Sequence, residues 1–225
     1  MNKITSVIFD MDGVIFNTER LYLESCIEVG EKHELEKVEE ACRKCIGITS
    51  AESDKIMKEY FGDKVPVDIY KEEVYKRFCE KFGDGKWLIK TGARELLDYL
   101  KTNGYKIALA SSTQKEGVTR ELRDAGLIDF FDELVCGDMV KKSKPEPDIF
   151  LEAASRIDSS LEECLVIEDS FNGIRAAYSA GIRAIMVPDL LEPDNEMKEK
   201  AWKILPSLVE VKELIEKRYE NGSKR

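Results

Sequence analysis

Short, predominantly apolar runs that alternate with helical segments are the feature of this 225-residue chain that most constrains its fold. The runs occupy residues 4–9, 105–110, 134–136, 165–167 and 184–187. Runs that are apolar on both faces are typical of strands in a parallel sheet, because helices cover such a sheet on both sides. The helical segments expected at 92–103, 113–125 and 170–180 each end at a glycine, a common end signal. We therefore predict an α/β fold with an open parallel sheet and right-handed crossovers.

The segment between the first two apolar runs, residues 10–104, is far longer than a crossover needs and contains no convincing strand pattern. Apolar side chains recur there at every fourth position, as Tyr70, Val74, Phe78 and Phe82. This spacing indicates the packing face of a helix. Thr49 and Glu52 have the spacing of a capping box before another helix. We predict a helical domain at residues 17–89, inserted into a core domain formed by residues 1–16 and 90–225.

The acidic composition excludes some classes of partner. The formal net charge is −10 and the isoelectric point is near 4.9, whereas nucleic acids and anionic membranes require a basic protein surface. No stretch approaches the ~18 apolar residues of a membrane span, and the first residues, MNKITSVIFDMDG, do not resemble a signal peptide. We expect a cytoplasmic protein with no membrane or nucleic-acid partner.

Only two of the six cysteines, Cys42 and Cys45, are close in sequence. A zinc site requires four ligands, and His33 is the only histidine of the chain, so zinc is disfavoured. A redox pair at Cys42 and Cys45 stays open, but a cytoplasmic location favours reduced, structural thiols.

Polar residues follow four of the predicted strands, at the points where ligands of open α/β sheets bind. These residues are Asp10 and Asp12 after the first strand, Ser111, Ser112 and Thr113 after the second, Lys144 after the third, and Glu168 and Asp169 after the fourth. Carboxylates that meet at one edge suit a hard cation such as Mg²⁺. A lysine beside hydroxyl or backbone donors suits a phosphate group.

The two aspartates of the first strand end can serve one reaction in different roles. Residues two apart in an extended segment point to the same side, so Asp10 and Asp12 are expected to face one ligand. One carboxylate would act as a nucleophile and the other as a proton donor, provided that a cation and a lysine balance their charges. Gly13 lets the backbone turn sharply beside them.

Four motifs of this chain resemble those of the haloacid dehalogenase (HAD) superfamily of phosphohydrolases. They are FDMDGVIFNTE, ALASSTQ, SKPEPDIF and VIEDSFNGIRAAYSAG, in this order and over nearly the whole chain. The chain is most similar to the branch with a helical cap, and within it to the β-phosphoglucomutase-like group. The resemblance implies a Rossmann-like core with a parallel sheet, an inserted α-helical cap domain, and a monomer that acts on a small phosphorylated metabolite.

The same resemblance implies the roles of the site residues. Asp10 would attack the phosphorus atom and form an aspartyl-phosphate, and Asp12 would protonate the leaving oxygen and then activate water. The Mg²⁺ cofactor would be held by Asp10, the backbone carbonyl of Asp12 and Asp169, with Glu168 acting through water or by holding another ligand. The phosphoryl oxygens would be bound by Ser111, Ser112 and Lys144. The cap would move about hinges near Thr18 and Lys90 to exclude water.

Two cap positions bear on the reaction type. The β-phosphoglucomutases carry a histidine in the first cap helix and an arginine in a cap loop, whereas the matching positions here are Tyr22 and Ser50. These departures favour a Mg²⁺-dependent phosphatase that hydrolyses a small monoester, such as a sugar phosphate. A phosphosugar mutase of the β-phosphoglucomutase type is the main alternative. Pyrophosphatase, phosphonatase and a non-catalytic phosphate-binding protein are further ones, and the last would require a degenerate site.

Overall fold

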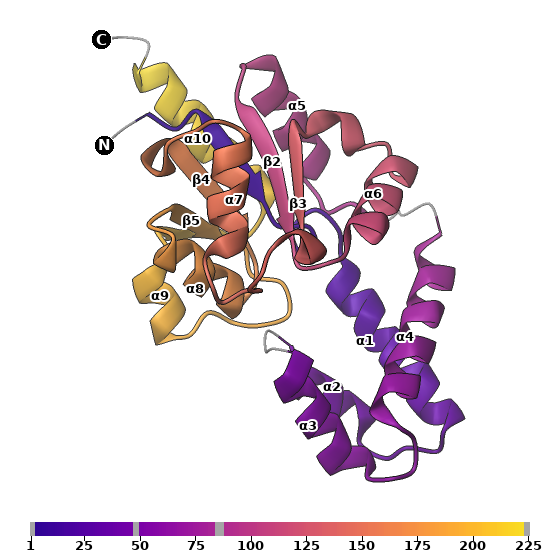
Figure 1. Ribbon diagram of the computed structural model, residues 1–225. Coiled ribbons are helices and arrows are strands. Elements are labelled where there is room, and N and C mark those ends of the chain that lie inside the picture. Colours follow the sequence, from indigo (N-terminus) through magenta and orange to yellow (C-terminus); the bar gives the residue numbers. More distant parts are fainter. Residues whose placement is uncertain (1–2, 47–49, 84–87, 223–225) are drawn as a thin grey trace. The chain divides into compact units, whose positions relative to one another are not determined.

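The structure is a computed structural model that describes residues 3–46, 50–83 and 88–222 (Figure 1). The chain forms two compact units. One consists of Met1–Phe16 together with Asp84–Arg225, and the other of Asn17–Gly83. The chain leaves the first unit and re-enters it at neighbouring points, since Phe16 forms a bridge with Ile89 and the Lys90 N–H donates to the Ile15 carbonyl at 2.9 Å.

The first unit is built on a parallel sheet whose strand order is β3-β2-β1-β4-β5-β6. The strands are β1 (Ser6–Phe9), β2 (Lys106–Ser111), β3 (Glu133–Cys136), β4 (Cys164–Glu168), β5 (Arg183–Met186) and β6 (Lys203–Ile204). The predicted parallel sheet is confirmed, and the first five strands lie at the predicted runs. The short strand β6 was not predicted, because two residues carry no apolar run.

Helices cover both faces of this sheet, as the apolar runs predicted. The helices are α5 (Ala93–Thr102), α6 (Lys115–Asp124), α7 (Asp148–Arg156), α8 (Phe171–Ser179), α9 (Asn195–Lys200) and α10 (Leu208–Gly222). Apolar residues of α7, α8 and α9 pack with Ile8 and Val166 in one core cluster. Val7 and Phe9 alternate with Ile8 along β1 and are also fully buried, so the opposite face is covered too.

The second unit contains the helices α1 (Thr18–Lys32), α2 (Val38–Lys44), α3 (Ser50–Phe61) and α4 (Val67–Phe82). The predicted apolar stripe of α4 is confirmed, because Tyr70, Val74, Phe78 and Phe82 are buried. The Tyr70 hydroxyl donates a 2.8 Å hydrogen bond to the Cys26 carbonyl on α1. Thr49, and with it the predicted capping box, lies outside the described residues.

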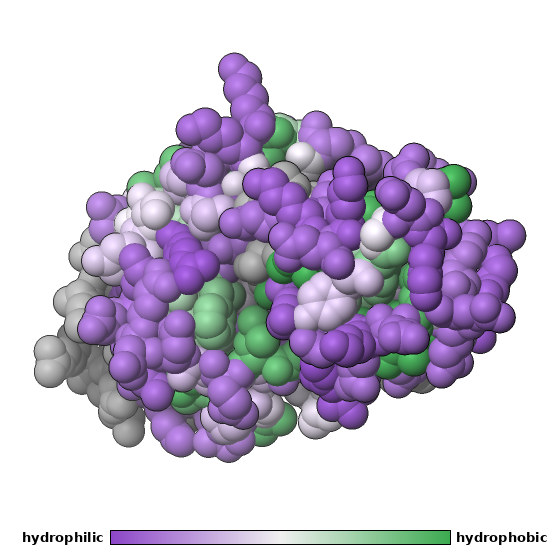
Figure 2. Space-filling model, turned by 90° about the horizontal axis from the view of Figure 1, so that it is seen from below, coloured by the Kyte–Doolittle hydropathy of each residue, from purple (hydrophilic) through white to green (hydrophobic). Residues whose placement is uncertain are grey.

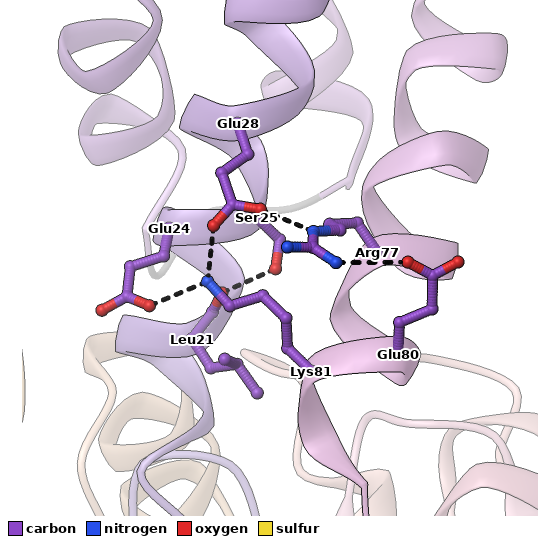
Figure 3. A network of polar contacts seen from close by, with 7 residues as sticks. All are labelled: Leu21, Glu24, Ser25, Glu28, Arg77, Glu80 and Lys81. Atoms are coloured by element: carbon purple, nitrogen blue, oxygen red, sulfur yellow. Dashed lines mark hydrogen bonds and ion pairs between the residues drawn. The ribbon is translucent and has the colours of Figure 1, made fainter.

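Charged side chains join α1 and α4 at the surface of this unit (Figure 3). Lys81 contacts Glu24 at 3.0 Å and Glu28 at 2.9 Å, and Arg77 contacts Glu28 at 2.5 Å and Glu80 at 3.3 Å. Ion pairs this exposed contribute little to stability, so the buried stripe of α4 holds the two helices together.

The face in Figure 2 is mostly hydrophilic, with scattered apolar side chains. In the described part of the chain, no helix has the length and apolar character to cross a membrane. All six cysteines are free, and Cys42 and Cys45 form no disulfide.

Candidate active site

A buried lysine connects the ends of three strands of the sheet. Lys144 donates hydrogen bonds to Asp10 Oδ1 at 2.5 Å, to Glu168 Oε1 at 2.8 Å and to the Ala110 carbonyl at 3.0 Å. Asp10 follows β1, and its N–H continues the sheet by donating to the Ile167 carbonyl at 3.0 Å. The lysine therefore pairs with two carboxylates that the parallel arrangement brings to one edge.

The charges of this cluster do not balance. Burial raises the pKa of Asp10 well above its ordinary value; the ammonium of Lys144 opposes this effect, and the carboxylates of Glu168 and Asp12 add to it. Burial lowers the pKa of Lys144, but the carboxylates of Asp10 and Glu168 together hold it above its ordinary value. One lysine thus faces several carboxylates in a poorly solvated place, and a further positive charge would stabilise them.

Three carboxylates lie close enough together to hold such a charge. Asp10, Glu168 and Asp169 each offer an oxygen atom, and these atoms lie within 4.8 Å of one another. Oxygen ligands of this kind suit a hard divalent cation, so the donor set fits the cation expected from the sequence. The Asp12 side chain is not one of the three ligands in this cluster.

Two glycines let the backbone approach the acidic cluster. A Cβ atom on Gly13, whose φ is +79°, would lie 2.1 Å from Asp169 Oδ2. A Cβ atom on Gly173 would lie 1.7 Å from Glu168 Oε1. The second oxygen of Glu168 accepts the Ser170 N–H at 2.6 Å, and Ser170 caps α8 by accepting the Gly173 N–H at 3.0 Å. The first turn of α8 is thus built around the Glu168 carboxylate.

The two serines predicted to bind phosphate lie at the end of β2, whereas Lys144 follows β3. Ser111 is fully buried, and its Oγ accepts the Thr113 N–H at 3.1 Å. Ser112 follows with an exposed side chain. Asp12 is partly exposed and accepts a 2.9 Å hydrogen bond from the Thr113 hydroxyl. The structure therefore places Asp12 beside the β2 end, and places Asp10 with Lys144 and the acidic pair after β4.

The predicted cap residues belong to the helical unit. Thr18 is buried and begins α1, and the ring of Tyr22 lies 6.2 Å from the ring of Phe78. Ser50 begins α3, and residues 47–49 before it lie outside the described residues. The proximity of Tyr22 and Ser50 to the carboxylates, and the hinge at Thr18, stay predictions.

Three further polar residues contact this part of the core: Thr113 was listed after the second strand without a role, Lys90 was expected only near a hinge, and Glu121 was not singled out. Thr113 contacts Asp12, as described above. Lys90 donates to the Gly13 carbonyl at 2.7 Å and to Asp189 Oδ1 at 2.8 Å, which ties the turn after Asp12 to the loop after β5. Glu121 of α6 is 2% exposed and contacts Arg120 at 3.2 Å. Asp189 follows the apolar run at 184–187, so the argument that selected Asp10, a polar residue directly after a predicted strand, could also have selected Asp189.

Comparison with known proteins identifies the family of this chain. Residues 7–187 match the model of the family described as haloacid dehalogenase-like hydrolase. The chain is 37% identical over 182 residues to a phosphorylated carbohydrates phosphatase of Thermotoga maritima, covering 80% of this chain and 83% of that relative. It is 31% identical to a bifunctional riboflavin kinase/FMN phosphatase of Arabidopsis thaliana, covering 94% of this chain and 56% of that relative.

Solved structures have a similar fold. β-Phosphoglucomutase of Clostridium difficile has a TM-score of 0.76 and 26% identity, over 99% of this chain and 100% of that one. CbbY of Rhodobacter sphaeroides, in a complex with xylulose-(1,5)bisphosphate, has a TM-score of 0.76 and 26% identity, over 92% and 96%. The chain therefore belongs to the haloacid dehalogenase-like hydrolase family, as an enzyme of its β-phosphoglucomutase-like group with a helical insertion after the first strand.

Proposed function

We propose that this protein is a Mg²⁺-dependent phosphatase that hydrolyses a small phosphate monoester, with sugar phosphates as the favoured class, through an aspartyl-phosphate on Asp10. The observation that carries the proposal is the contact of buried Lys144 with both Asp10 and Glu168, beside Asp169. The phosphorylated carbohydrates phosphatase of Thermotoga maritima supports the substrate class.

The first half-reaction transfers the phosphoryl group to Asp10. An oxygen of the Asp10 carboxylate attacks phosphorus, and the bond from phosphorus to the leaving oxygen breaks. The electron pair of that bond stays with the leaving oxygen, which takes a proton from Asp12. Lys144 balances part of the negative charge throughout, and Ser111 and Ser112 hold the other phosphoryl oxygens.

The second half-reaction releases phosphate. Asp12, now ionised, accepts a proton from a water molecule whose oxygen attacks the phosphorus of the aspartyl-phosphate. The bond between phosphorus and the Asp10 oxygen breaks, which restores the carboxylate and yields inorganic phosphate. When bound by Asp10, Asp169 and the Asp12 carbonyl, Mg²⁺ supplies positive charge to the phosphoryl oxygens.

Hydrolysis is favoured over mutase chemistry by two cap positions. A mutase must grip a doubly phosphorylated intermediate and protect its phosphoenzyme from water. Tyr22 and Ser50 stand where the mutases carry a histidine and an arginine, so this cap lacks these groups at the two matching positions. The likeness to β-phosphoglucomutase of Clostridium difficile keeps a phosphosugar mutase as the second candidate.

A screen of phosphate monoesters with Mg²⁺ tests the proposal. We expect release of inorganic phosphate, its loss in Asp10→Asn or on chelation of Mg²⁺, and full activity in Asp98→Asn, a matched change of an exposed α5 residue. Asp12→Ala should retain Mg²⁺ binding and slow turnover by ~10²–10⁴-fold. Conversion of glucose 1-phosphate and its bisphosphate to glucose 6-phosphate, without release of phosphate from any ester, would instead identify a mutase.

A further inference from the structure

Thr113 connects the end of β2 to the residue proposed as the acid and base. Its Oγ1 hydroxyl donates to Asp12 Oδ2 at 2.9 Å, across 101 positions of the sequence. Asp12 follows β1, and the strands β1 and β2 are neighbours in the sheet. The contact thus joins two loops at the carboxyl edge of the sheet.

The backbone of Thr113 is held on both sides. Its N–H donates to Ser111 Oγ at 3.1 Å, and its carbonyl accepts the Gly137 N–H at 3.0 Å. Gly137 itself fits closely, because a Cβ atom there would lie 2.1 Å from the Ser112 carbonyl oxygen. Ser111 is buried and is paired in the sheet with Cys136. The backbone of Thr113 is therefore held by the ends of β2 and β3, which limits where its hydroxyl can lie.

The side chain of Asp12 benefits from such a constrained donor. Asp12 lies after the end of β1, is partly exposed, and precedes Gly13, whose positive φ turns the chain. A carboxylate on a turn has several rotamers within reach, whereas proton transfer requires one orientation. A threonine is a suitable partner, since its branched side chain has a stiff χ1 angle.

We propose that Thr113 is a positioning residue that orients the Asp12 carboxyl group for proton transfer. This inference rests on the proposed function. The Thr113 hydroxyl holds Oδ2 of Asp12 and so sets the orientation of the carboxyl group that gives a proton to the leaving oxygen and later takes one from water. Thr113 itself transfers no proton and forms no bond to the substrate.

Two variants and two esters test this role. Thr113→Val keeps the shape of the side chain and removes the hydroxyl, and Thr113→Ser keeps the hydroxyl. The esters are p-nitrophenyl phosphate, whose phenolate leaves readily without a proton, and a simple alkyl phosphate, whose alkoxide requires one. The readout is kcat/KM, because it reports the step in which the leaving oxygen is protonated.

We expect Thr113→Val to lower kcat/KM for the alkyl ester by ~10–100-fold and to change p-nitrophenyl phosphate by less than about threefold, with Thr113→Ser close to the parent on both. The Mg²⁺ concentration for half-maximal activity should not change. Equal losses on the two esters, or a Thr113→Ser variant as impaired as Thr113→Val, would overturn the role. Thermal unfolding of each variant separates such a result from misfolding.

Asp12→Ala on the same two esters separates this inference from the proposed function. If Asp12→Ala is selective for the alkyl ester and Thr113→Val is not, only the role of Thr113 fails. If Asp12→Ala affects both esters equally, Asp12 is not the acid and the role of Thr113 fails with it, whereas the phosphatase itself fails only if no ester releases phosphate.

Discussion

Lys144, Asp10 and Glu168 form the least water-exposed charged group of the site. A buried ion pair is weak support for stability, because desolvation of the charges offsets much of their attraction. Here the carboxylates outnumber the lysine, and burial raises the pKa of Asp10. This arrangement is costly for folding and useful for binding a cation, as expected of residues selected for chemistry.

Glu121 gives a prediction for the pH dependence of stability. Burial, and then the Asp12 carboxylate, raise its pKa to about 7, although the Arg120 guanidinium opposes this. Between pH 4.5 and about 7 the folded state therefore keeps a proton on Glu121 that the unfolded state releases. The contribution of protonated Glu121 to the free energy of unfolding is fully present below pH 4.5 and is lost as the pH rises through about 7.

Glu121→Gln should remove this loss of stability at high pH, because glutamine does not ionise. At pH 8 we expect the variant to unfold at a higher temperature than the parent, with a free energy of unfolding greater by at most about 3 kcal/mol. At pH 5 the two proteins should differ little. Thermal melts at both pH values measure the difference. Glu116→Gln, an exposed change on the same helix, is the control and should show no such pH dependence.

At the scale of elements, buried contacts and not surface charges should hold α1 to α4. The Tyr70 hydroxyl donates a hydrogen bond to a carbonyl of α1 inside the apolar core of the helical unit. The ion pairs of Figure 3 are partly exposed. Periodicity predicted the stripe of α4, but not which of its residues carries this hydrogen bond. Neither α7 nor α9 is among the predicted helices, although Ile149, Phe150 and Ala153 of α7 have helical spacing.

Tyr70→Phe removes that hydrogen bond and keeps the ring. We expect a loss of about 1 kcal/mol, which should speed amide hydrogen exchange in α1 and α4 about fivefold. Arg77→Gln, which breaks the surface network, should leave the exchange nearly unchanged. If Arg77→Gln accelerates the exchange more than Tyr70→Phe, the ranking of buried over exposed contacts is wrong for this unit.

At the scale of the whole molecule, the candidate site depends on segments that lie far apart in the chain. Asp10 comes before the inserted unit, and Lys144, Glu168 and Asp169 come long after it. A cation held by the ends of β1 and β4 would bind only the folded core and would therefore stabilise it.

Added Mg²⁺ should therefore raise the unfolding temperature of the parent protein. A concentration 100-fold above the dissociation constant corresponds to about 2.7 kcal/mol. Asp169→Asn should remove most of the Mg²⁺-dependent shift, and Glu152→Gln, a change of a partly exposed α7 residue that pairs with Arg156, should retain it. An unchanged shift in Asp169→Asn would place the cation elsewhere. Melting curves with Mg²⁺ and with a chelator measure this.

The sequence by itself determined the fold class and which polar residues lie at the carboxyl ends of the strands. Runs that are apolar on both faces can only be buried between helices, and this requirement brings Asp10, Lys144, Glu168 and Asp169 to one edge of a parallel sheet. The sequence also located the inserted helices, because one crossover does not need residues 10–104.

Only the tertiary structure decided which groups touch. Three contacts depend on side-chain rotamers and on the conformation of loops. They are the pairing of Lys144 with two carboxylates, the hydrogen bond from Thr113 to Asp12, and the ion pair of Lys90 with Asp189. The close approach of the Gly173 backbone to the Glu168 carboxylate, which leaves no space for a side chain, was likewise decided by the tertiary structure. Such contacts are set by packing between distant segments, and periodicity and spacing carry no information about them.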